Sequence, residues 1–565
     1  MPIAVAPMTT PHGPRKVRPR RHAAQLMLAL AVLVTTAPSQ IDAGVPNDLL
    51  VRIASLPRGA EATGLFVHGD SLFLNVQHPA DGNPPPFNRA TVGVIEGLRF
   101  ESDGGVEPAH LPAPTARHRG EMRVSPGGAY RVLGRRGDPI KGLDHGLGAL
   151  MSADGSTLVK ESNDPDFNAV VPDPKTAGRA YLFTNWEDRP GGMSRLQLNH
   201  SSTGWTVEGG TMVDFAAVQG TWVNCFGTLS PWNTPLSSEE LYFDHTVDWN
   251  DPDHSLHPEI QQLARYLGGQ YPNPYRYGYI VEISDPTHPI PRPIKRYALG
   301  RFSHENAVVM PDERTVYLSD DGANTVLFKF VADRPGDLSS GTLHAAKIRQ
   351  GNGSDLADII LYIDWVPLAR ANQDSIAGWI ADYDGIGPVG PAPEDRPGYL
   401  TDAAIEAWAS GNAADDRAAF LESRKAAAAR GATAEFTKLE GINIHLAGAR
   451  SGQVPWMYLA VSDITGSMSD NQGDLQLPEN RCGAVYRMRL DGAFNVSAME
   501  PVLIGGPIRP WAVFDRCHPD GVANPDNLVV LSDGRLVVGE DSYFHTNNFV
   551  WLFNPPGGAA EAPIH

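Results

Sequence analysis

Pairs of apolar, β-rich runs separated by a polar turn recur along the chain at irregular intervals. Repeated antiparallel strand units of this kind are typical of β-propellers, in which neighbouring sheets bury each other's faces. The pattern therefore predicts an all-β fold, a six-bladed β-propeller. The six pairs of runs are 72–79 with 90–97, 181–188 with 193–198, 234–240 with 277–284, 315–322 with 325–330, 457–463 with 484–492, and 535–542 with 549–554.

One segment, residues 401–436, departs from this pattern. It is rich in Ala, Glu and Arg and has no strand signal, so it predicts two helices that end near Gly431. The preceding segment, 366–400, is predicted to be a long loop. We interpret the helices as an insertion in a single propeller domain that spans residues 44–565.

The N-terminal segment has the pattern of an export signal. Basic residues at 14–21 precede an apolar run at 22–37 that is too short to span a bilayer, and a cleavage site follows Ala43. Arg20 and Arg21 suggest twin-arginine export, with general secretion as the alternative. The predicted location is therefore periplasmic or secreted, without stable membrane insertion. We expect a monomer.

The chain has 46 Lys and Arg against 65 Asp and Glu, a formal net charge of −19. This balance argues against nucleic-acid binding, which needs a surplus of basic side chains. Acidic residues also follow the first run of most pairs, where they either start turns or converge on a common centre. For the six pairs together, we favour convergence on one site.

The chain lacks a P-loop, a GxSxG elbow, a HExxH motif and a CxxC motif. The remaining candidates each have a structural alternative. Cys225 is either a metal ligand or a buried thiol, His304 before Glu305 could be structural, and Lys438 and Glu440 could form a surface ion pair. Many carboxylates with one thiolate suit calcium together with a transition metal such as iron.

The motifs TWVNCFGTLSPWNTPLSSEE (221–240), GRFSHENA (300–307), YLSDDG (317–322), FTKLEGI (436–442) and NPDNLVV (524–530) together resemble the PhoX-type alkaline phosphatases. The resemblance implies an exported phosphatase for small phosphate esters that uses two ferric ions and calcium. It implies three sets of functional residues: metal ligands Cys225, Glu240, Glu305, Asp320, Glu440 and Asp526; catalytic residues Cys225, Lys438 and Glu305; and substrate-binding residues Lys438, Asn224 and His304.

Departures from the family pattern leave other functions open. Lys438 stands where the family has an arginine, and a lysine is a point charge rather than a bidentate donor. One alternative is a calcium-dependent propeller hydrolase of the lactonase or organophosphatase kind. Another is a catalytically impaired propeller that binds metal or phosphate. Cys482 and Cys517 either form a disulfide or are buried thiols.

Overall fold

The computed structural model describes residues 49–101, 104–388 and 398–556. Residues Gly44–His565 form one compact unit, built mainly of antiparallel β-sheet. The predicted export signal at 1–43 lies outside the described residues. Among the helices that are described, none combines the length and the apolar character needed to cross a membrane.

Three sheets have four antiparallel strands each, and sequence order matches spatial order within them. Their strands are β2 (Glu61–His68), β3 (Ser71–Gln77), β4 (Thr91–Glu96) and β6 (Ala129–Arg135); β9 (Pro165–Pro172), β10 (Arg179–Trp186), β11 (Gly192–Ser201) and β12 (Gly204–Met212); and β13 (Asn224–Leu229), β14 (Pro235–Glu239), β15 (Ile280–Ser284) and β16 (Arg292–Lys295).

Two larger sheets complete the main framework. A nine-stranded sheet joins β17 (His304–Val309), β18 (Thr315–Asp320), β20 (Phe328–Arg334), β21 (Asp337–Gln350) and β22 (Leu361–Asn372) to β27 (Ala498–Ile504), β26 (Ala484–Arg489), β25 (Trp456–Val461) and β24 (Leu439–Ile444). The second sheet is β28 (Pro525–Val530), β29 (Leu536–Glu540), β30 (Phe549–Phe553), β1 (Leu50–Ser55) and β5 (Arg123–Val124), so the first described strand pairs with the last.

Two short strand pairs lie outside this framework. They are β7 (Ala149–Met151) with β8 (Leu158–Glu161), and β19 (Ala323–Thr325) with β23 (Phe436–Thr437).

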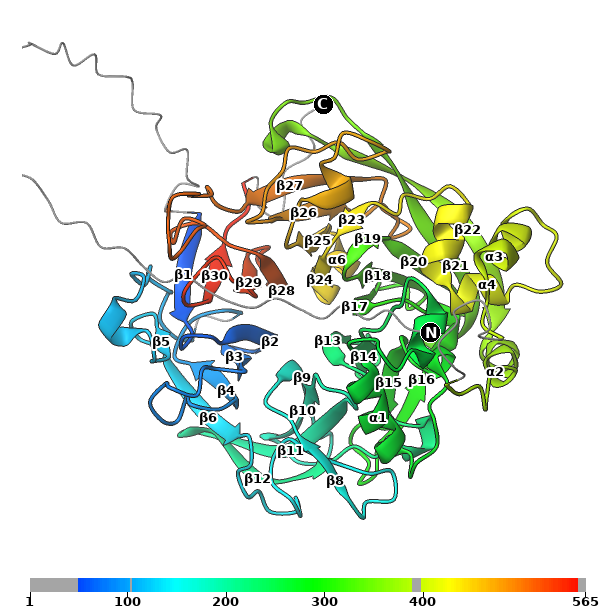
Figure 1. The fold of residues 1–565 in the computed structure, drawn as a ribbon. Helices are drawn as coiled ribbons and strands as arrows, with labels where there is room; N and C mark the ends of the chain where they lie inside the picture. The colour runs from blue at the N-terminus through cyan, green and yellow to red at the C-terminus, as the bar shows by residue number, and fades with distance from the viewer. Residues whose placement is uncertain (1–48, 102–103, 389–397, 557–565) are drawn as a thin grey trace, which may run out of the picture. The chain divides into compact units, whose positions relative to one another are not determined.

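Six strands form a closed series of contacts around a common centre. In order, β2 contacts β9, β9 contacts β13, β13 contacts β17, β17 contacts β24, β24 contacts β28, and β28 contacts β2 again. Figure 1 shows these six strands on the inner side of their sheets. Each is therefore the innermost strand of one unit of adjacent antiparallel strands and lies at an end of its sheet, so the first residues of the six can meet.

The sheets are buried on both faces, which explains the continuous apolar runs in the sequence. Side chains alternate between the two faces of a strand. In β25, Met457, Leu459 and Val461 belong to one hydrophobic cluster, whereas Tyr458 and Ala460 belong to another. Each sheet thus contributes to two neighbouring cores.

The prediction of a predominantly β chain with repeated strand pairs is confirmed. All six predicted pairs are adjacent antiparallel strands: β3 with β4, β10 with β11, β14 with β15, β18 with β20, β25 with β26, and β29 with β30. The innermost strands were not among the predicted pairs, and they are the strands that lead to the centre.

The helical region differs from its prediction. Residues 401–436 hold three helices rather than two, and the segment predicted as a loop from 366 contains the end of β22 and a helix whose N-cap is Asn372. A non-helical backbone conformation at Glu422, with φ −134° and ψ 51°, separates the last two helices of the insertion. The part of the chain that the structure describes has six α-helices: α1 (His257–Tyr266), α2 (Gln373–Ala381), α3 (Asp402–Ala409), α4 (Arg417–Leu421), α5 (Ser423–Ala429) and α6 (Leu446–Ser451).

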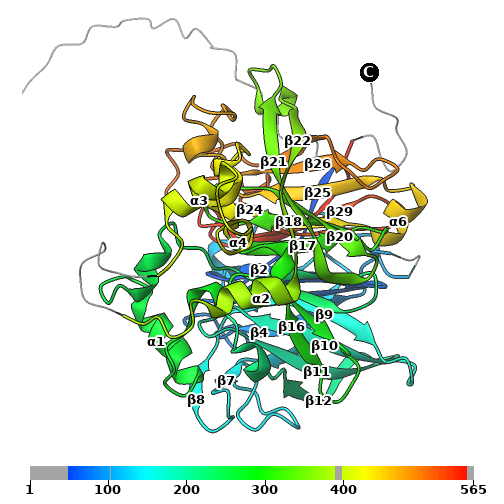
Figure 2. The same cartoon turned by 90° about the vertical axis from the view of Figure 1, so that its right-hand side faces the viewer.

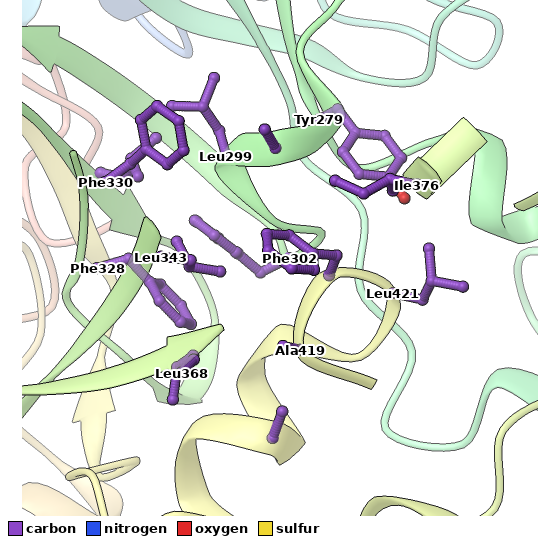
Figure 3. Close-up of a cluster of buried hydrophobic side chains, with 14 of the residues drawn as sticks. Tyr279, Leu299, Phe302, Phe328, Phe330, Leu343, Leu368, Ile376, Ala419 and Leu421 are labelled. Atoms are coloured by element: carbon purple, nitrogen blue, oxygen red, sulfur yellow. The ribbon is translucent and has the colours of Figure 1, made fainter. Parts of the chain in front are cut away.

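The inserted helices pack on the outside of β20, β21 and β22 through one hydrophobic cluster. Figure 3 shows Ile376 of α2 and Leu421 of α4 on one side of Phe302, with Phe328 on the other. The rings of Phe302 and Phe328 are stacked, with centroids 4.2 Å apart. In Figure 2, α2, α3 and α4 lie together below the projecting end of β21 and β22. The insertion is therefore part of the core.

Replacing Phe302 with alanine is expected to lower the free energy of unfolding by about 3–5 kcal/mol, because the cavity would lie between the sheet and the helices. Chemical denaturation of purified protein measures this change. Ile290, which is 68% exposed, provides the control, and Ile290→Ala should change stability by less than about 0.5 kcal/mol. Equal losses for the two variants would contradict this account of the core.

The cysteine pairing that the sequence left open is resolved. Cys482 and Cys517 form a disulfide, and Cys225 is a buried free thiol. The disulfide joins the turn before β26 to the segment that precedes β28.

Candidate metal centre

Five of the six innermost strands carry an acidic or thiol side chain at their second residue, and β2 carries one at its first. The last residue of the following strand faces the first residue of the innermost strand, as in Asn224↔Glu239 and His304↔Asp320. These side chains therefore lie at the same end of every unit. They are Glu61, Asp166, Cys225, Glu305, Glu440 and Asp526.

A second set of acids comes directly after the neighbouring strands. In four units, the first residue after the second strand is acidic and is coupled electrostatically to the first set. These residues are Glu187, Glu240, Asp321 and Asp541. We call the two sets together the central acidic cluster: nine carboxylates and one thiol.

β-Bulges help to direct these side chains. The strand register shifts between Asn224 and Gly227, and between His304 and Asn306, which leaves Cys225 and Glu305 outside regular pairing. The same shift follows the first residues of β24 and β28. Because a bulge bends the strand and re-aims its side chains, it allows several units to point a ligand atom at one centre.

Cys225 lies between two groups of acids. Its Sγ donates to Glu305 Oε2 at 3.0 Å and to Asp166 Oδ2 at 3.3 Å. Two sets of three side chains have ligand atoms within 4.8 Å of one another. They are Asp166, Glu187 and Cys225, and Glu305, Glu440 and Asp526. The thiol thus connects two sites of metal-binding size.

Half of the cluster residues are buried and the others are partly exposed, and few cations oppose the cluster's charge. Burial raises the pKa of Glu305 and of Asp526 well above the ordinary carboxyl value, and their neighbouring carboxylates raise it further. Burial, followed by Glu61, raises the pKa of Glu187 to about 8. Among the described residues, only Lys438 and His78 form ion pairs with members of the cluster.

Lys438 reaches the cluster from a half-exposed position. Its Nζ lies 3.1 Å from Asp321 Oδ1 and 2.9 Å from Glu440 Oε1, and its side chain is 38% exposed. Burial opposes its charge, but Asp321 and Glu440 outweigh burial and raise the pKa of Lys438. The ammonium group of Lys438 therefore lies at the solvent-facing edge of the cluster.

Adjacent acids at three strand ends have different roles, because successive side chains on a strand point in opposite directions. The first acid of each pair is held by local donors. Glu239 accepts from Lys295 and from the backbone of Tyr279, and Glu540 accepts from Trp551 Nε1 at 2.7 Å. The second acid belongs to the cluster. The pairs are Glu239–Glu240, Asp320–Asp321 and Glu540–Asp541.

Asp320 follows this rule and lies outside the cluster. Arg424 of α5 donates to Asp320 Oδ2 from Nε at 3.0 Å and to Oδ1 from Nη2 at 2.5 Å. The backbone N–H of Val326 also donates to Asp320. Asp321, one residue later than the predicted ligand Asp320, belongs to the central acidic cluster instead.

Two other predicted residues also point elsewhere. His304 is buried, donates from Nε2 to the Gly300 carbonyl at 3.0 Å, and stacks on Phe302. Burial lowers its pKa to about 3. The amide of Asn224 donates to Ser237 Oγ at 2.9 Å. Both side chains support the strands that carry Glu305 and Cys225.

The cluster thus includes Cys225, Glu240, Glu305, Glu440 and Asp526 from the prediction, with Lys438 at its edge. Glu187, which follows β10 within the predicted run 181–188, also belongs to the cluster. Other members were missed, although their position after a predicted strand or at the start of an innermost one was a usable signal. These are Glu61, Asp166, Asp321 and Asp541.

The donor set fits metal ions. Asp166 Oδ1 and Glu305 Oε1 are buried without a hydrogen-bond partner. Buried carboxylate oxygens of this kind need either protonation or a compensating cation. Oxygen-rich sites suit calcium, and the thiolate adds a ligand that favours a transition metal.

Comparisons with known proteins agree with this chemistry. The family model "Alkaline phosphatase PhoX" matches residues 191–557. The structure of Pseudomonas fluorescens PhoX in complex with vanadate, a transition state analogue, is similar at 20% identity and a TM-score of 0.52, covering 76% of this chain and 86% of that one. No curated protein matches the chain.

A lower similarity is found to the soluble aldose sugar dehydrogenase of Escherichia coli. The identity is 9% and the TM-score 0.35, over 90% of this chain and 99% of the dehydrogenase.

Proposed function

Since the chain belongs to the PhoX family of alkaline phosphatases, we propose that it hydrolyses small phosphate monoesters with metal ions held by the central acidic cluster. The observation that carries this proposal is the buried thiol of Cys225 between Asp166 and Glu305. In a site that holds both calcium and a transition metal, a single thiolate among carboxylates serves as a ligand of the transition metal. The closed series of six innermost strands supports the interpretation of the fold as a six-bladed propeller with the cluster in its channel.

We assign iron to the neighbourhood of Cys225 and calcium to the surrounding carboxylates. The proposed ligands are Cys225, Glu240, Glu305, Glu440 and Asp526, with Asp321 replacing Asp320 and with Asp166 and Glu187 added. Bound metal ions would polarise the phosphoryl group and stabilise the charge that develops on it. Metal binding requires the thiolate, and Glu305 Oε2 is positioned to accept the thiol proton.

Lys438 is the proposed contact for the phosphate. Its Nζ is shared between Asp321 and Glu440 and lies at the solvent side of the cluster, so it can exchange one carboxylate partner for a phosphoryl oxygen. The positive charge then balances the incoming dianion. Because an ammonium group is a point charge, Lys438 orients the ester less strictly than an arginine fork would. Asn224 and His304 support the site indirectly through their strands.

Family membership and the N-terminal pattern also support export. The basic residues at 14–21 and the apolar run at 22–37 have the order of a cleavable signal, with Arg20 and Arg21 in the place of a twin-arginine pair. We propose a periplasmic or secreted enzyme that acts as a monomer. Export in the folded state would suit a protein whose metal centre is enclosed by the fold.

The test combines elemental analysis with an assay of aryl phosphate hydrolysis on one sample of exported protein. We expect iron in stoichiometric amounts together with calcium. Removal of the metals by a chelator should lower activity by about a hundredfold or more, and iron plus calcium should restore it.

Other outcomes would identify the alternatives. Calcium without iron, combined with turnover of lactones or phosphotriesters, would favour the calcium-dependent hydrolase. Stoichiometric metal without turnover of any ester would indicate a binding protein. Either result would contradict the proposed phosphatase.

A further inference from the structure

Exposed apolar side chains are concentrated on two neighbouring loops. Among the described residues, nine large hydrophobic side chains are exposed, and five of them lie between β27 and β28 or between β29 and β30. These five are Ile508, Trp511, Val513, Phe514 and Tyr543. Single exposed apolar residues are common, whereas a group of this kind marks an interaction surface. We call residues 507–517 the Trp511 loop.

The base of the Trp511 loop is fixed while its apolar tip faces solvent. Cys517 is held by the disulfide to Cys482, and the backbone N–H of Thr546 donates to Asp515 at 2.7 Å. The guanidinium of Arg516 lies 5.1 Å from the ring centre of Phe544. Trp511 is 80% exposed and Val513 84%. The loop is therefore an anchored projection that presents apolar groups.

The Trp511 loop itself carries a net positive charge, opposite in sign to that of the whole chain. The loop contains Arg509 and Arg516, and its single acid, Asp515, lies 3.8 Å from Arg119. The guanidinium of Arg119 also lies 5.6 Å from the ring centre of Phe514. Because salt screens charges beyond about 8 Å, these arginines, rather than the net charge of −19, govern contacts made by the loop.

The loop emerges at the end of its sheet that carries the central acidic cluster. It precedes β28, whose second residue is Asp526, and it packs on the segment that follows Asp541. In that segment, Tyr543 comes two residues after Asp541, a member of the central acidic cluster. A surface bound by the loop would therefore lie on the side of the molecule where Lys438 is exposed to solvent.

We propose that the Trp511 loop docks the protein on an anionic lipid surface. Tryptophan and other apolar side chains enter the interfacial region of a bilayer, while nearby arginines contact anionic headgroups. Stable peripheral binding needs both signals, and the loop supplies both. Side chains that project this far into solvent contact a small ligand on one side only. A lipid surface, in contrast, buries Trp511, Val513 and Phe514 at the same time.

Co-sedimentation of the purified protein with vesicles tests this proposal. We expect binding to vesicles of phosphatidylglycerol and phosphatidylcholine, weaker binding to phosphatidylcholine alone, and loss of binding at high salt. Replacing Trp511, Val513 and Phe514 together by serine should weaken vesicle binding by about tenfold or more. Hydrolysis of a soluble aryl phosphate should stay within about twofold, because these residues lie outside the proposed catalytic machinery.

Ile290→Ser is the matched control, since Ile290 is an exposed apolar residue in the turn between β15 and β16. This variant should bind vesicles like the unchanged protein. Equal vesicle binding by the triple variant, or failure of the unchanged protein to bind, would overturn the proposal. Concentration-dependent dimerisation that the triple serine variant abolishes would do the same, because it would identify a second copy as the occupant. Vesicle binding is measured without turnover, so its outcome is independent of the proposed phosphatase activity.

Discussion

Replacing Cys225 with alanine is expected to remove bound iron and to lower phosphatase turnover by about a thousandfold or more. The thiol connects Asp166 and Glu305, so its loss separates the two groups of ligands. The strand should persist, because the backbone of β13 pairs with β14. Elemental analysis and kinetic assays on the same sample measure both effects.

Two further variants test whether the sulfur atom of Cys225 itself is needed for iron binding. Cys225→Ser keeps the size of the side chain but replaces sulfur with a harder ligand, so we expect calcium to be retained and iron to be lost. Ser238→Ala is the control, since Ser238 is a buried residue of β14 whose hydroxyl has no hydrogen-bond partner. It should keep the metal content of the unchanged protein. Stoichiometric iron and full activity in Cys225→Ala would contradict the assignment of Cys225.

The second large effect is expected at Arg424. Its guanidinium neutralises Asp320, donates to the Asp321 carbonyl at 3.0 Å and covers the ring of Tyr242 at 4.2 Å. Arg424→Met leaves Asp320 buried without a counter-ion, which costs about 3–5 kcal/mol of folding stability. Denaturant unfolding measures the loss. Activity should fall as well, because Arg424 supports the segments that carry Glu240 and Asp321.

The two acids beside Arg424 provide a matched comparison. Asp320→Asn should lower stability while keeping most of the bound metal. Asp321→Asn should lower metal content and activity with a smaller loss of stability, because Asp321 pairs with half-exposed Lys438. The reverse outcome would restore Asp320 as the ligand. A stability loss in Arg424→Met below about 1 kcal/mol would show that the ion pair is not structural.

The second and third strands of each unit, counted from the centre, could be predicted from the sequence because their runs are largely apolar. The runs around β3 and β25 stand out for this reason. The innermost strands carry buried polar side chains, such as Asn168 in β9 and Thr63 in β2, which interrupt the apolar pattern. Strand recognition therefore failed where the chain approaches its centre.

The candidate site was predictable in composition but not in register. The neighbouring acids Asp320 and Asp321 are chemically equivalent in the sequence, and one residue decides which face of a strand a side chain occupies. The partner that separates them, Arg424, comes from a helix about a hundred residues later. Asp166 was missed for a related reason, because its strand was not recognised.

The pairing of β1 with β30 has a consequence for the order of folding. β1 is the first described strand to be synthesised and β30 is the last, so this sheet cannot form until the whole chain has been made. Contacts between residues this distant in sequence form late and slowly during folding. The unit that contributes Asp526 and Asp541 is therefore the last to take shape. A nascent chain that lacks β30 holds an incomplete central acidic cluster, so the proposed metal site is completed only with the last described strand.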